Sequence, residues 1–393
     1  MKILTVIPAI GNVYGGPSKS VIELAEAITQ QGINVDLVTT NANGDQTLDV
    51  PLYTWNQNNN VRIQYFSYLG WQDYKWSFAL GKWLFQHVKE YDLVHTNAVF
   101  SLNNLPAYWA CQCHQIPYIV TPRGMLEPWA LAYKAQKKLA YFKLLERPAL
   151  QKASAIQVLA KSEAERIQPL QLNSPLVTVP NGIHCHHFAP PASAEPFRKQ
   201  FPHLRDKQLI LFLGRIDPKK GLDLLAPAFA QVHQQFPNSH LIIAGPDNIG
   251  YLPTAQKLFQ DVGGQDAVTF TGILNGDLKY SALAAASVYV APSYSEGFSI
   301  SILEGLASGL PCVFTDACNF PEASDVAKIV PVDFQQIAQA LHWCFANPEE
   351  AKAMGQQARE FIFEHYTWDK IAANLVQIYD AIIHNQPLPH LHA

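Results

Sequence analysis

Residues 293–313 read Ser-Tyr-Ser-Glu-Gly-Phe-Ser-Ile-Ser-Ile-Leu-Glu-Gly-Leu-Ala-Ser-Gly-Leu-Pro-Cys-Val. This stretch follows an apolar, strand-like run, Ser287–Pro292, and its second half, Ile300–Ala307, has the apolar pattern of a helix. We therefore expect Glu296 on a loop that joins a strand to a helix, and Glu304 within that helix. The amino end of such a helix presents backbone N–H groups and a positive dipole to an anion.

Two carboxylates beside an anion-binding loop suit a ligand that carries both hydroxyl groups and phosphate, such as a nucleotide sugar. Either glutamate alone would more simply be a solvated surface side chain. The strand before the loop, Gly297 directly after the first glutamate and the helix around the second glutamate favour the ligand-binding interpretation.

Length and composition limit the class of protein. A chain of 393 residues is too long for one typical core, so two domains are expected, and a hydrophobic content of 48% can fill large cores. The net charge of −4 argues against a general nucleic-acid binder, which is usually basic. No apolar run approaches the roughly 18 to 20 residues that span a bilayer.

The amino terminus and the cysteines favour a cytoplasmic protein. Met1–Ile10 superficially resembles a signal peptide, but its apolar part is short and continues into Gly11–Gly16 without a cleavage-like site, so it reads as a buried strand. The six cysteines show no disulfide-framework spacing. Cys111-x-Cys113-His114 has no second ligand pair, so packing is favoured over a metal site, and a reducing compartment fits best.

Short apolar strands alternate with helical patterns along the chain, which predicts parallel α/β architecture in two doubly wound, Rossmann-like domains that face a central cleft. We expect an amino-terminal domain over residues 1–187 and a linker over 188–206, where Pro190 and Pro191 interrupt the pattern. A second domain follows over 207–365, and a final helix over 366–393. Ligands of such sheets bind at the carboxyl ends of the strands. The expected strands are Lys2–Ile7, Ile33–Thr39, Val61–Phe66, Asp92–His95, Tyr118–Thr121, Ala155–Leu159, Leu176–Val179, Leu209–Leu213, His240–Ala244, Val268–Thr271, Ser287–Ala291, Cys312–Thr315 and Lys328–Val332.

Two further strand-end loops carry candidate site residues. Gly15 and Gly16 would let backbone approach a phosphate or sugar closely, although a simple tight turn is the alternative and no GxGxxG fingerprint is present. Arg215 and Lys220 are cations on the loop after the first strand of the second domain. Positioned cations neutralise the charge that develops on a diphosphate leaving group, and the chain contains no Asp-x-Asp motif, which favours a metal-free solution.

These motifs resemble the retaining family-4 glycosyltransferases of GT-B fold, in particular members from polysaccharide and lipopolysaccharide biosynthesis. The resemblance is carried by Gly214–Asp223 together with Glu296–Glu304 and Pro180–Ile183, and it extends over nearly the whole chain. It implies transfer of a sugar from a nucleotide diphospho-sugar to an acceptor with retained anomeric configuration, without a metal or other cofactor. It further implies a front-face reaction in which the leaving phosphate takes the acceptor proton. By the same resemblance, residues 1–187 would form the acceptor-side domain and 207–365 the donor domain, and the final helix over 366–393 would cross back to the amino-terminal domain.

The resemblance also implies roles for the cationic and backbone groups of the loops. Arg215 and Lys220 would contact the donor diphosphate. Gly297, Phe298 and Ser299 would offer backbone donors to the sugar and the phosphate. These three sit in the loop that also carries the first glutamate.

The same family assigns the two glutamates different tasks. Glu304 would bind the ribose hydroxyls, and Glu296 would contact the donor sugar as its anomeric bond breaks. Gly16 would approach the donor from the other domain. The family commonly has an aspartate where this chain has His184, which leaves the hinge contacts open but not the reaction. A hinge with exposed histidines is favoured there over a metal site.

Two strand-end segments of the first domain carry acceptor-side candidates. Tyr91–Asn97 places His95 at the carboxyl end of a strand, where a family histidine orients the donor sugar or helps to deprotonate the acceptor; a structural histidine is the alternative. Thr121–Trp129 resembles a motif of polysaccharide-biosynthesis members. Its Arg123 and Glu127 bind donor phosphate or acceptor hydroxyls, or form a buried salt bridge.

A cationic, amphipathic segment suggests where the acceptor resides. Its cations and interleaved apolar residues favour either contact with an anionic membrane that holds lipid-linked acceptors or a solvated helix face. We accordingly expect a glycan or lipid-linked acceptor, no nucleic-acid partner, and a cytoplasmic location with peripheral contact at the inner face of the membrane as one option. For the nearby aromatics Trp71, Tyr74, Trp76 and Phe78, packing is the default and an acceptor role the alternative. The cations are Lys134, Lys137, Lys138, Lys143 and Arg147, and the apolar residues are Leu131, Leu139, Phe142 and Leu145.

Two other functions stay open at this point. One is a nucleotide-sugar epimerase of the same architecture, which would convert a donor without an acceptor. The other is a non-catalytic protein that binds a sugar nucleotide and turns nothing over. The complete set of donor-side residues favours the transferase over both.

Overall fold

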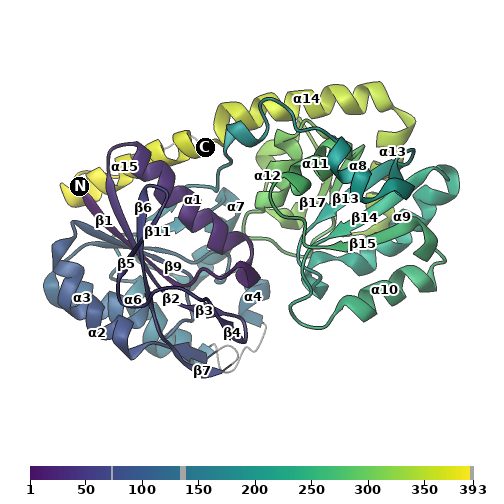
Figure 1. Cartoon of the computed structure of the whole chain (residues 1–393). Helices are drawn as coiled ribbons and strands as arrows, with labels where there is room; N and C mark the ends of the chain where they lie inside the picture. Colours follow the sequence, from purple (N-terminus) through teal and green to yellow (C-terminus); the bar gives the residue numbers. More distant parts are fainter. Residues whose placement is uncertain (72–73, 133–138, 390–393) are drawn as a thin grey trace. The chain divides into compact units, whose positions relative to one another are not determined.

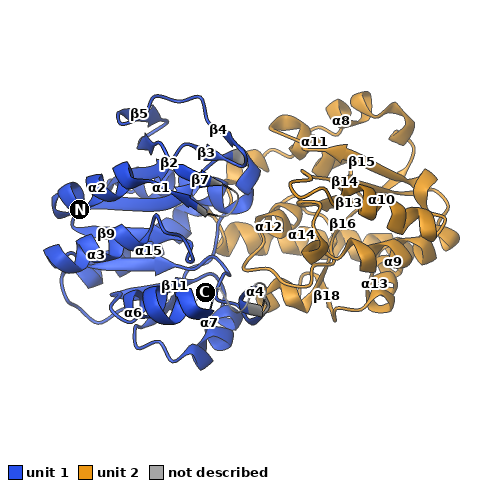
Figure 2. Cartoon of the chain, turned by 90° about the horizontal axis from the view of Figure 1, so that it is seen from below, with its two compact units in different colours: residues 1–182, 368–393 blue, residues 183–367 orange. Residues whose placement is uncertain are grey.

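The computed structural model of the chain describes residues 1–71, 74–132 and 139–389 (Figure 1). The chain forms two compact units, which are coloured separately in Figure 2. Unit 1 comprises Met1–Gly182 and Trp368–Ala393, and unit 2 comprises Ile183–Thr367. Each unit is built on its own sheet with its own core.

The sheet of unit 1 has eight strands in the order β12-β11-β10-β9-β1-β2-β6-β5. Its strands are parallel except β5, which pairs antiparallel with β6. The strand order reverses between β1 and β9, so the loops after these two strands share the position where ligands of open α/β sheets bind. The bounds are β1 Lys2–Ala9, β2 Asn34–Thr40, β5 Trp55–Asn58, β6 Val61–Phe66, β9 Leu93–Asn97, β10 Tyr118–Thr121, β11 Ala155–Val158 and β12 Leu176–Thr178.

Helices cover both faces of this sheet, which explains why its strands are apolar throughout. Successive side chains of β1 point to opposite faces, so Ile3 and Ile7 join the core under α1 and α15, whereas Leu4 and Val6 join the core under α2 and α3. The polar stretch 40–60 carries short strands as well as loop. Unit 1 also contains β3 Ala42–Asn43, β4 Gln46–Thr47, β7 Leu69–Trp71, β8 Tyr74–Trp76, α1 Gly16–Gln30, α2 Phe78–His87, α3 Leu105–His114, α4 Pro128–Ala132, a π-helical turn Phe142–Glu146, α6 Arg147–Leu150, α7 Lys161–Ile167 and α15 Trp368–Ile383, besides short 3-10 turns.

The sheet of unit 2 has six parallel strands in the order β15-β14-β13-β16-β17-β18. This is the 3-2-1-4-5-6 order of a Rossmann fold, and the order reverses between β13 and β16. The strands are β13 Gln208–Leu213, β14 Ser239–Ala244, β15 Val268–Gly272, β16 Val288–Ala291, β17 Cys312–Thr315 and β18 Lys328–Val330. The helices are α8 Glu195–Gln200, α9 Leu222–Gln235, α10 Leu252–Asp261, α11 Asp277–Ala285, α12 Ile300–Ala307, α13 Phe334–Ala346 and α14 Pro348–His365.

The boundaries between the units differ from the expected ones. The chain passes from unit 1 to unit 2 after Gly182 rather than after residue 187, and it returns at Trp368. Residues 188–206, expected as a linker, belong to unit 2 and include α8. Phe197 of α8 is fully buried, and its backbone N–H donates to Ser281 Oγ at 2.8 Å, so this segment is part of the core rather than a connection.

The last helix, α15, packs on unit 1 and completes its core. Trp368 at its start is 1% exposed, and its indole Nε1 donates to Glu23 Oε2 of α1 at 2.9 Å. Gly182 lies directly beneath: a Cβ atom on Gly182 would stand 2.9 Å from the backbone nitrogen and the ring of Trp368. The Pro180–Ile183 motif thus has a glycine because backbone and indole leave no room for a side chain.

This close approach predicts that Gly182→Ala destabilises the chain by about 1 to 3 kcal/mol, because the added methyl group overpacks the contact with Trp368. The midpoint of thermal unfolding should fall by several degrees, as followed by circular dichroism. Gly264→Ala is the matched control, because a Cβ atom there would meet its nearest neighbour at an ordinary 3.6 Å. Equal midpoints for both variants would contradict the packing argument.

Candidate functional site

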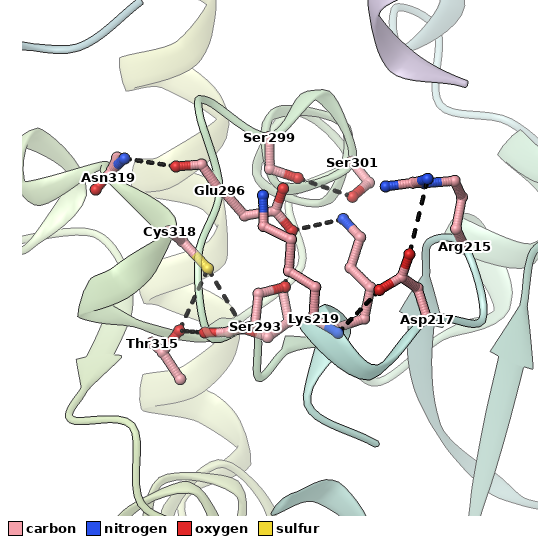
Figure 3. Close-up of polar contacts among 12 residues, drawn as sticks. Arg215, Asp217, Lys219, Ser293, Glu296, Ser299, Ser301, Thr315, Cys318 and Asn319 are labelled. Atoms are coloured by element: carbon pink, nitrogen blue, oxygen red, sulfur yellow. Dashed lines mark hydrogen bonds and ion pairs between the residues drawn. The ribbon is translucent and has the colours of Figure 1, made fainter. Parts of the chain in front are cut away.

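The loops after β13 and β16 of unit 2 meet at the point where the strand order reverses, and they carry most of the predicted site residues. Lys220 Nζ lies 2.5 Å from Glu296 Oε1. The same oxygen accepts a hydrogen bond from Ser293 Oγ at 2.7 Å. Figure 3 shows this group with Arg215 and Asp217 beside it. The structure therefore brings together two of the predicted residues, Lys220 and Glu296, in direct contact.

The two loops are pressed together at a glycine. Gly221 has φ +70°, and a Cβ atom there would lie 1.9 Å from the carbonyl oxygen of Pro292. A backbone hydrogen bond from Tyr294 N to Lys219 O, at 2.9 Å, joins the same loops. Only glycine satisfies both the left-handed backbone and the close approach. The position of Lys220 relative to Glu296 thus follows from the backbone.

Charges around Glu296 keep it ionised. Burial alone would raise the pKa of Glu296, but Lys220, Lys219 and the hydrogen bond from Ser293 outweigh burial and hold the pKa below its ordinary value. Burial lowers the pKa of the neighbouring Lys219, and the nearby cations Lys220 and Arg215 lower it further. Three cations, Lys219, Lys220 and Arg215, therefore lie near two carboxylates, Glu296 and Asp217.

Arg215 is the more open of the predicted cations. Its side chain is 41% exposed and lies 3.8 Å from Asp217 Oδ2, a loose contact across the same loop. Asp217 has its own structural task, because its Oδ1 accepts from Lys219 N at 2.9 Å and caps the short turn that leads to Lys220. Arg215 is thus free to move toward an anion without breaking a tight ion pair.

The amino end of α12 has the expected form. Its N-cap residue, Ser299, makes no side-chain hydrogen bond to the backbone of the first turn, and its hydroxyl lies 3.1 Å from Ser301 Oγ in that turn. Phe298 is 7% exposed, and its ring packs edge-on against Phe320, so its side chain belongs to the packing of unit 2. The backbone roles expected for Gly297, Phe298 and Ser299 stay predictions.

Glu304 lies within α12, as expected, and forms an ion pair that the sequence did not reveal. Lys279 of α11 places its Nζ 2.6 Å from Glu304 Oε1, and Glu304 is 5% exposed. Asn319 is a second residue that the sequence reading missed: its Nδ2 donates to the carbonyl oxygen of Glu296 and holds the loop. Neither residue stands in a recognisable motif, since each meets its partner only through tertiary contact.

The glycine loop of unit 1 also lies at a strand-order reversal. Gly15, with φ +72°, is the N-cap of α1, and Gly16 is the first residue of that helix. This geometry directs the amino end of α1 toward the carboxyl ends of β1 and β9, as an anion-binding loop requires. Contact of Gly15 and Gly16 with a donor stays a prediction.

Arg123 organises the carboxyl edge of the unit 1 sheet. It has φ +57°, and its guanidinium donates to Asn97 Oδ1 at 2.7 and 3.1 Å and to Ser20 Oγ and Asn181 Oδ1, each at 3.1 Å. Burial lowers its pKa to about 10, so it remains a cation at neutral pH. Contact of Arg123 with a donor stays a prediction. Its hydrogen bonds show that it holds Asn97, Ser20 and Asn181 together.

Glu127, the companion of Arg123 in the sequence, takes the salt-bridge alternative. It is 3% exposed and lies 2.8 Å from Arg166 Nε. Its partner is therefore an arginine of α7 rather than Arg123.

His95 is buried in unit 1 with both ring nitrogens engaged. Nδ1 lies 2.6 Å from the hydroxyl of Tyr379 on α15, and Nε2 lies 2.6 Å from Thr121 Oγ1. Burial, helped by the charge of Arg123, lowers the pKa of His95 to about 3. The contacts give His95 a structural task in docking α15, and its proposed part in proton transfer stays a prediction.

The predicted cationic segment and the nearby aromatic residues have different outcomes. Lys134, Lys137 and Lys138 lie outside the described residues. Trp76 and Phe78 are 41% and 67% exposed, so they are not core residues.

The histidines predicted at the hinge contact one another in tilted and edge-on arrangements. His187 stacks on Tyr280 with ring centres 4.6 Å apart. Within residues 1–71, 74–132 and 139–389, no cluster of His, Cys, Asp or Glu is arranged to hold a metal ion. In the same residues, no helix combines the length and apolar character needed to cross a membrane.

The neutral imidazole of His95 predicts acid sensitivity. The unfolded chain protonates His95 below its ordinary pKa of 6.5, whereas folded His95 stays neutral to about 3. The free energy of unfolding therefore falls as pH drops below about 6.5, by about 2 kcal/mol at pH 5 from this group alone. His95→Gln removes this contribution, so the difference in thermal midpoint between wild type and variant should narrow between about pH 7.5 and pH 5. The exposed His114→Gln serves as control, and a gap for His95→Gln that does not change with pH contradicts the assignment.

Comparison with known proteins shows which family this chain is related to. The sequence model for glycosyltransferase family 4 matches residues 14–187, and the model for glycosyl transferases group 1 matches residues 193–361. A GDP-mannose-dependent alpha-(1-6)-phosphatidylinositol monomannoside mannosyltransferase of Mycobacterium tuberculosis is 31% identical over 209 residues, which cover 50% of this chain and 54% of that relative, about half its length. A phosphatidyl-myo-inositol mannosyltransferase of Mycobacterium leprae is 25% identical over 97% of both chains.

Solved structures share the fold. Sucrose-phosphate synthase from Thermosynechococcus elongatus superposes with a TM-score of 0.78 at 22% identity, over 98% of this chain and 100% of that chain. HepE of Anabaena, solved with UDP and glucose, superposes with a TM-score of 0.77 at 17% identity, over 97% and 100%. These likenesses and the two doubly wound units confirm the expected GT-B fold. The chain belongs to the family-4 glycosyltransferases.

Proposed function

We propose that the chain is a retaining glycosyltransferase that moves a sugar from a nucleotide diphospho-sugar to a glycan or lipid-linked acceptor without a metal ion. The observation that carries this proposal is the contact of Lys220 with an ionised Glu296 at the strand-order reversal of unit 2. A cation and a carboxylate in contact suit the two charges that separate when a glycosyl phosphate bond breaks. The family match supports the reaction class.

The diphosphate of the donor would lie against Arg215, Lys220 and the first turn of α12. As the bond from the anomeric carbon to the phosphate oxygen breaks, negative charge grows on that oxygen. Fixed cations and backbone N–H groups stabilise this charge without reorganisation. Arg215, with its open side chain and loose partner, is able to turn to the phosphate.

Glu296 would act on the sugar side of the breaking bond. The anomeric carbon becomes positive as the phosphate leaves, and an ionised carboxylate beside it stabilises that charge and accepts hydrogen bonds from sugar hydroxyls. The acceptor oxygen then bonds to the anomeric carbon on the face that the phosphate left, and its proton passes to the phosphate oxygen. This sequence needs neither a covalent nucleophile nor a protein base.

Glu304 would bind the ribose. Its ion pair with Lys279, at 2.6 Å, holds its carboxylate in place on α12. The names of the relatives suggest two donors to test. GDP-mannose is named for the mycobacterial enzyme, and UDP and glucose accompany HepE. The phosphatidylinositol-based acceptors in the names of the relatives support a lipid-linked acceptor, and with it a cytoplasmic enzyme that works at the membrane surface.

A donor screen followed by activity measurement tests the proposal. Thermal shift with GDP-mannose and UDP-glucose identifies the donor, since a ligand that binds the folded state raises the midpoint. Lys220→Ala and Glu296→Gln should each then lower kcat by about 10²- to 10³-fold, because each removes a fixed charge from the transition state. Lys257→Ala, on the exposed face of α10, is the control and should retain full activity.

Wild-type rates in both site variants would contradict the assignment of Lys220 and Glu296. Proton NMR of the product reports the anomeric configuration, which should match that of the donor. Donor incubated alone should yield no epimer, whereas a new epimer would favour an isomerase.

Removal of metals is a separate prediction. Because Arg215 and Lys220 would neutralise the diphosphate themselves, an excess of EDTA should change the rate by less than about twofold. Added Mg²⁺ or Mn²⁺ should not stimulate the chelated enzyme. A rate that collapses with EDTA and returns with one of these ions would show that the diphosphate requires a metal.

A further inference from the structure

Unit 1 holds a cavity that the proposed donor chemistry does not use. Its volume is about 310 Å³, which is at the lower end of the range for ligand pockets. Leu131, Leu139, Phe142 and Leu170 give it an apolar lining. Phe142 begins the π-helical turn that leads into α6, which is labelled at the lower edge of unit 1 in Figure 2. The cavity is therefore suited to a hydrocarbon group.

Two cations line the same cavity. Lys143 is exposed, and Arg147 is the first residue of α6. No acidic side chain is among the described residues that line the cavity. An apolar cavity with cations and without carboxylates favours a ligand that is both hydrophobic and anionic.

Arg147 carries the most specific signal. Its Nε is buried, yet it has no hydrogen-bond partner in the part of the chain that the structure describes. A buried donor without an acceptor is destabilising, and more so when the group is charged. Oxygen atoms of a phosphate match the forked donors of a guanidinium, so a bound phosphate would satisfy this nitrogen.

The neighbouring Glu146 is already engaged inside unit 1, because each of its carboxylate oxygens accepts a hydrogen bond there. Glu146 is fully buried; its Oε2 accepts from Phe100 N at 3.0 Å and its Oε1 accepts from the hydroxyl of Tyr108 at 3.2 Å. These bonds fix the inner side of the π-helical turn. Such turns occur often at functional sites. Here the turn leaves Lys143 and Arg147 to line the cavity.

Apolar surface continues outside the cavity. Leu144 is 75% exposed and Leu139 is 52% exposed, and both lie within a few residues of the two cations. Exposed leucines beside basic residues are typical of surfaces that rest on anionic lipid.

We propose that this cavity binds a lipid phosphate, with part of the hydrocarbon chain against Leu139, Phe142 and Leu170 and the phosphate on Arg147 and Lys143. Free phosphate would leave the apolar lining in water, and a neutral lipid would leave Arg147 Nε without an acceptor. The inference rests on the proposed function in one respect, since it takes the lipid to be the carrier of the sugar acceptor.

Direct binding to the full chain tests the proposal without any transfer reaction. The probe is dodecyl phosphate below its micellar concentration, measured by titration calorimetry, with inorganic phosphate and dodecyl maltoside as comparators. Wild type should bind dodecyl phosphate at least about tenfold more tightly than either comparator. Arg147→Gln should weaken that binding by about tenfold or more. Lys82→Ala, which removes an exposed cation from α2, should leave it unchanged.

Thermal unfolding separates a binding role from a structural one. Because Arg147 Nε lacks an acceptor in the protein alone, Arg147→Gln should keep or raise the midpoint without dodecyl phosphate and should lose the rise that this probe causes in wild type. A large fall in the midpoint of the variant without probe would show that Arg147 is structural and would overturn the inference. Co-sedimentation should show more wild-type protein on vesicles of phosphatidylcholine with phosphatidic acid than on phosphatidylcholine alone, and this excess should shrink for Arg147→Gln.

Further binding results would overturn the proposed lipid-phosphate site. Equal binding of dodecyl phosphate by wild type and Arg147→Gln overturns the site, as does equal affinity for inorganic phosphate or for dodecyl maltoside. Thermal shift with GDP-mannose and UDP-glucose reports on unit 2 separately. Loss of lipid binding with normal donor binding would therefore count against this cavity alone, and the reverse result would count against the proposed function alone.

Discussion

The close approach of Gly221 to the carbonyl oxygen of Pro292 is the constraint on which the donor-side arrangement depends. No side chain fits between these two backbones, so the loops after β13 and β16 lie in contact. That contact fixes Lys220 beside Glu296, and the hydrogen bond from Tyr294 to Lys219 holds the register of the two loops. The placement of charge at the strand-order reversal is therefore a property of the backbone, set before any ligand arrives.

A buried ion pair such as that of Lys220 with Glu296 contributes little net stability to the fold. Burial removes water from both ions, and the attraction between them often does little more than offset that loss. Lys220 and Glu296 are only 14% and 13% exposed, and Lys219 and Arg215 add further positive charge nearby. The cations outnumber the carboxylates in this cluster, which favours the binding of an anion. Under the proposed function that anion is the donor diphosphate, and Glu296 stays ionised because the nearby cations and Ser293 lower its pKa.

Local pattern in the sequence predicted the elements well, because the core strands are apolar on both faces and end at recognisable loops. It placed Glu296 on its loop and Glu304 in its helix for the same reason. The sequence pattern did not predict Lys279 as a site residue, because its ion pair with Glu304 joins two helices and no motif or spacing indicates that contact. The contact of His95 with Tyr379 links residues 284 positions apart, and the boundary after Gly182 follows from the packing of Trp368, so neither was visible locally.

Unit 1 builds its carboxyl edge from buried acids rather than from an ion pair with lysine. Glu146 accepts from the backbone of Phe100 after β9, and Glu163 accepts from Gly124 after β10 and Leu159 after β11 at 3.0 and 2.7 Å. Burial raises the pKa of both carboxyls to about 7. Their contribution to stability is thus complete below about pH 4.5 and is lost as pH rises through about 7. The loops that follow β9, β10 and β11 are therefore held by groups that titrate near neutrality, whereas the lowered pKa of Glu296 keeps that carboxylate ionised there.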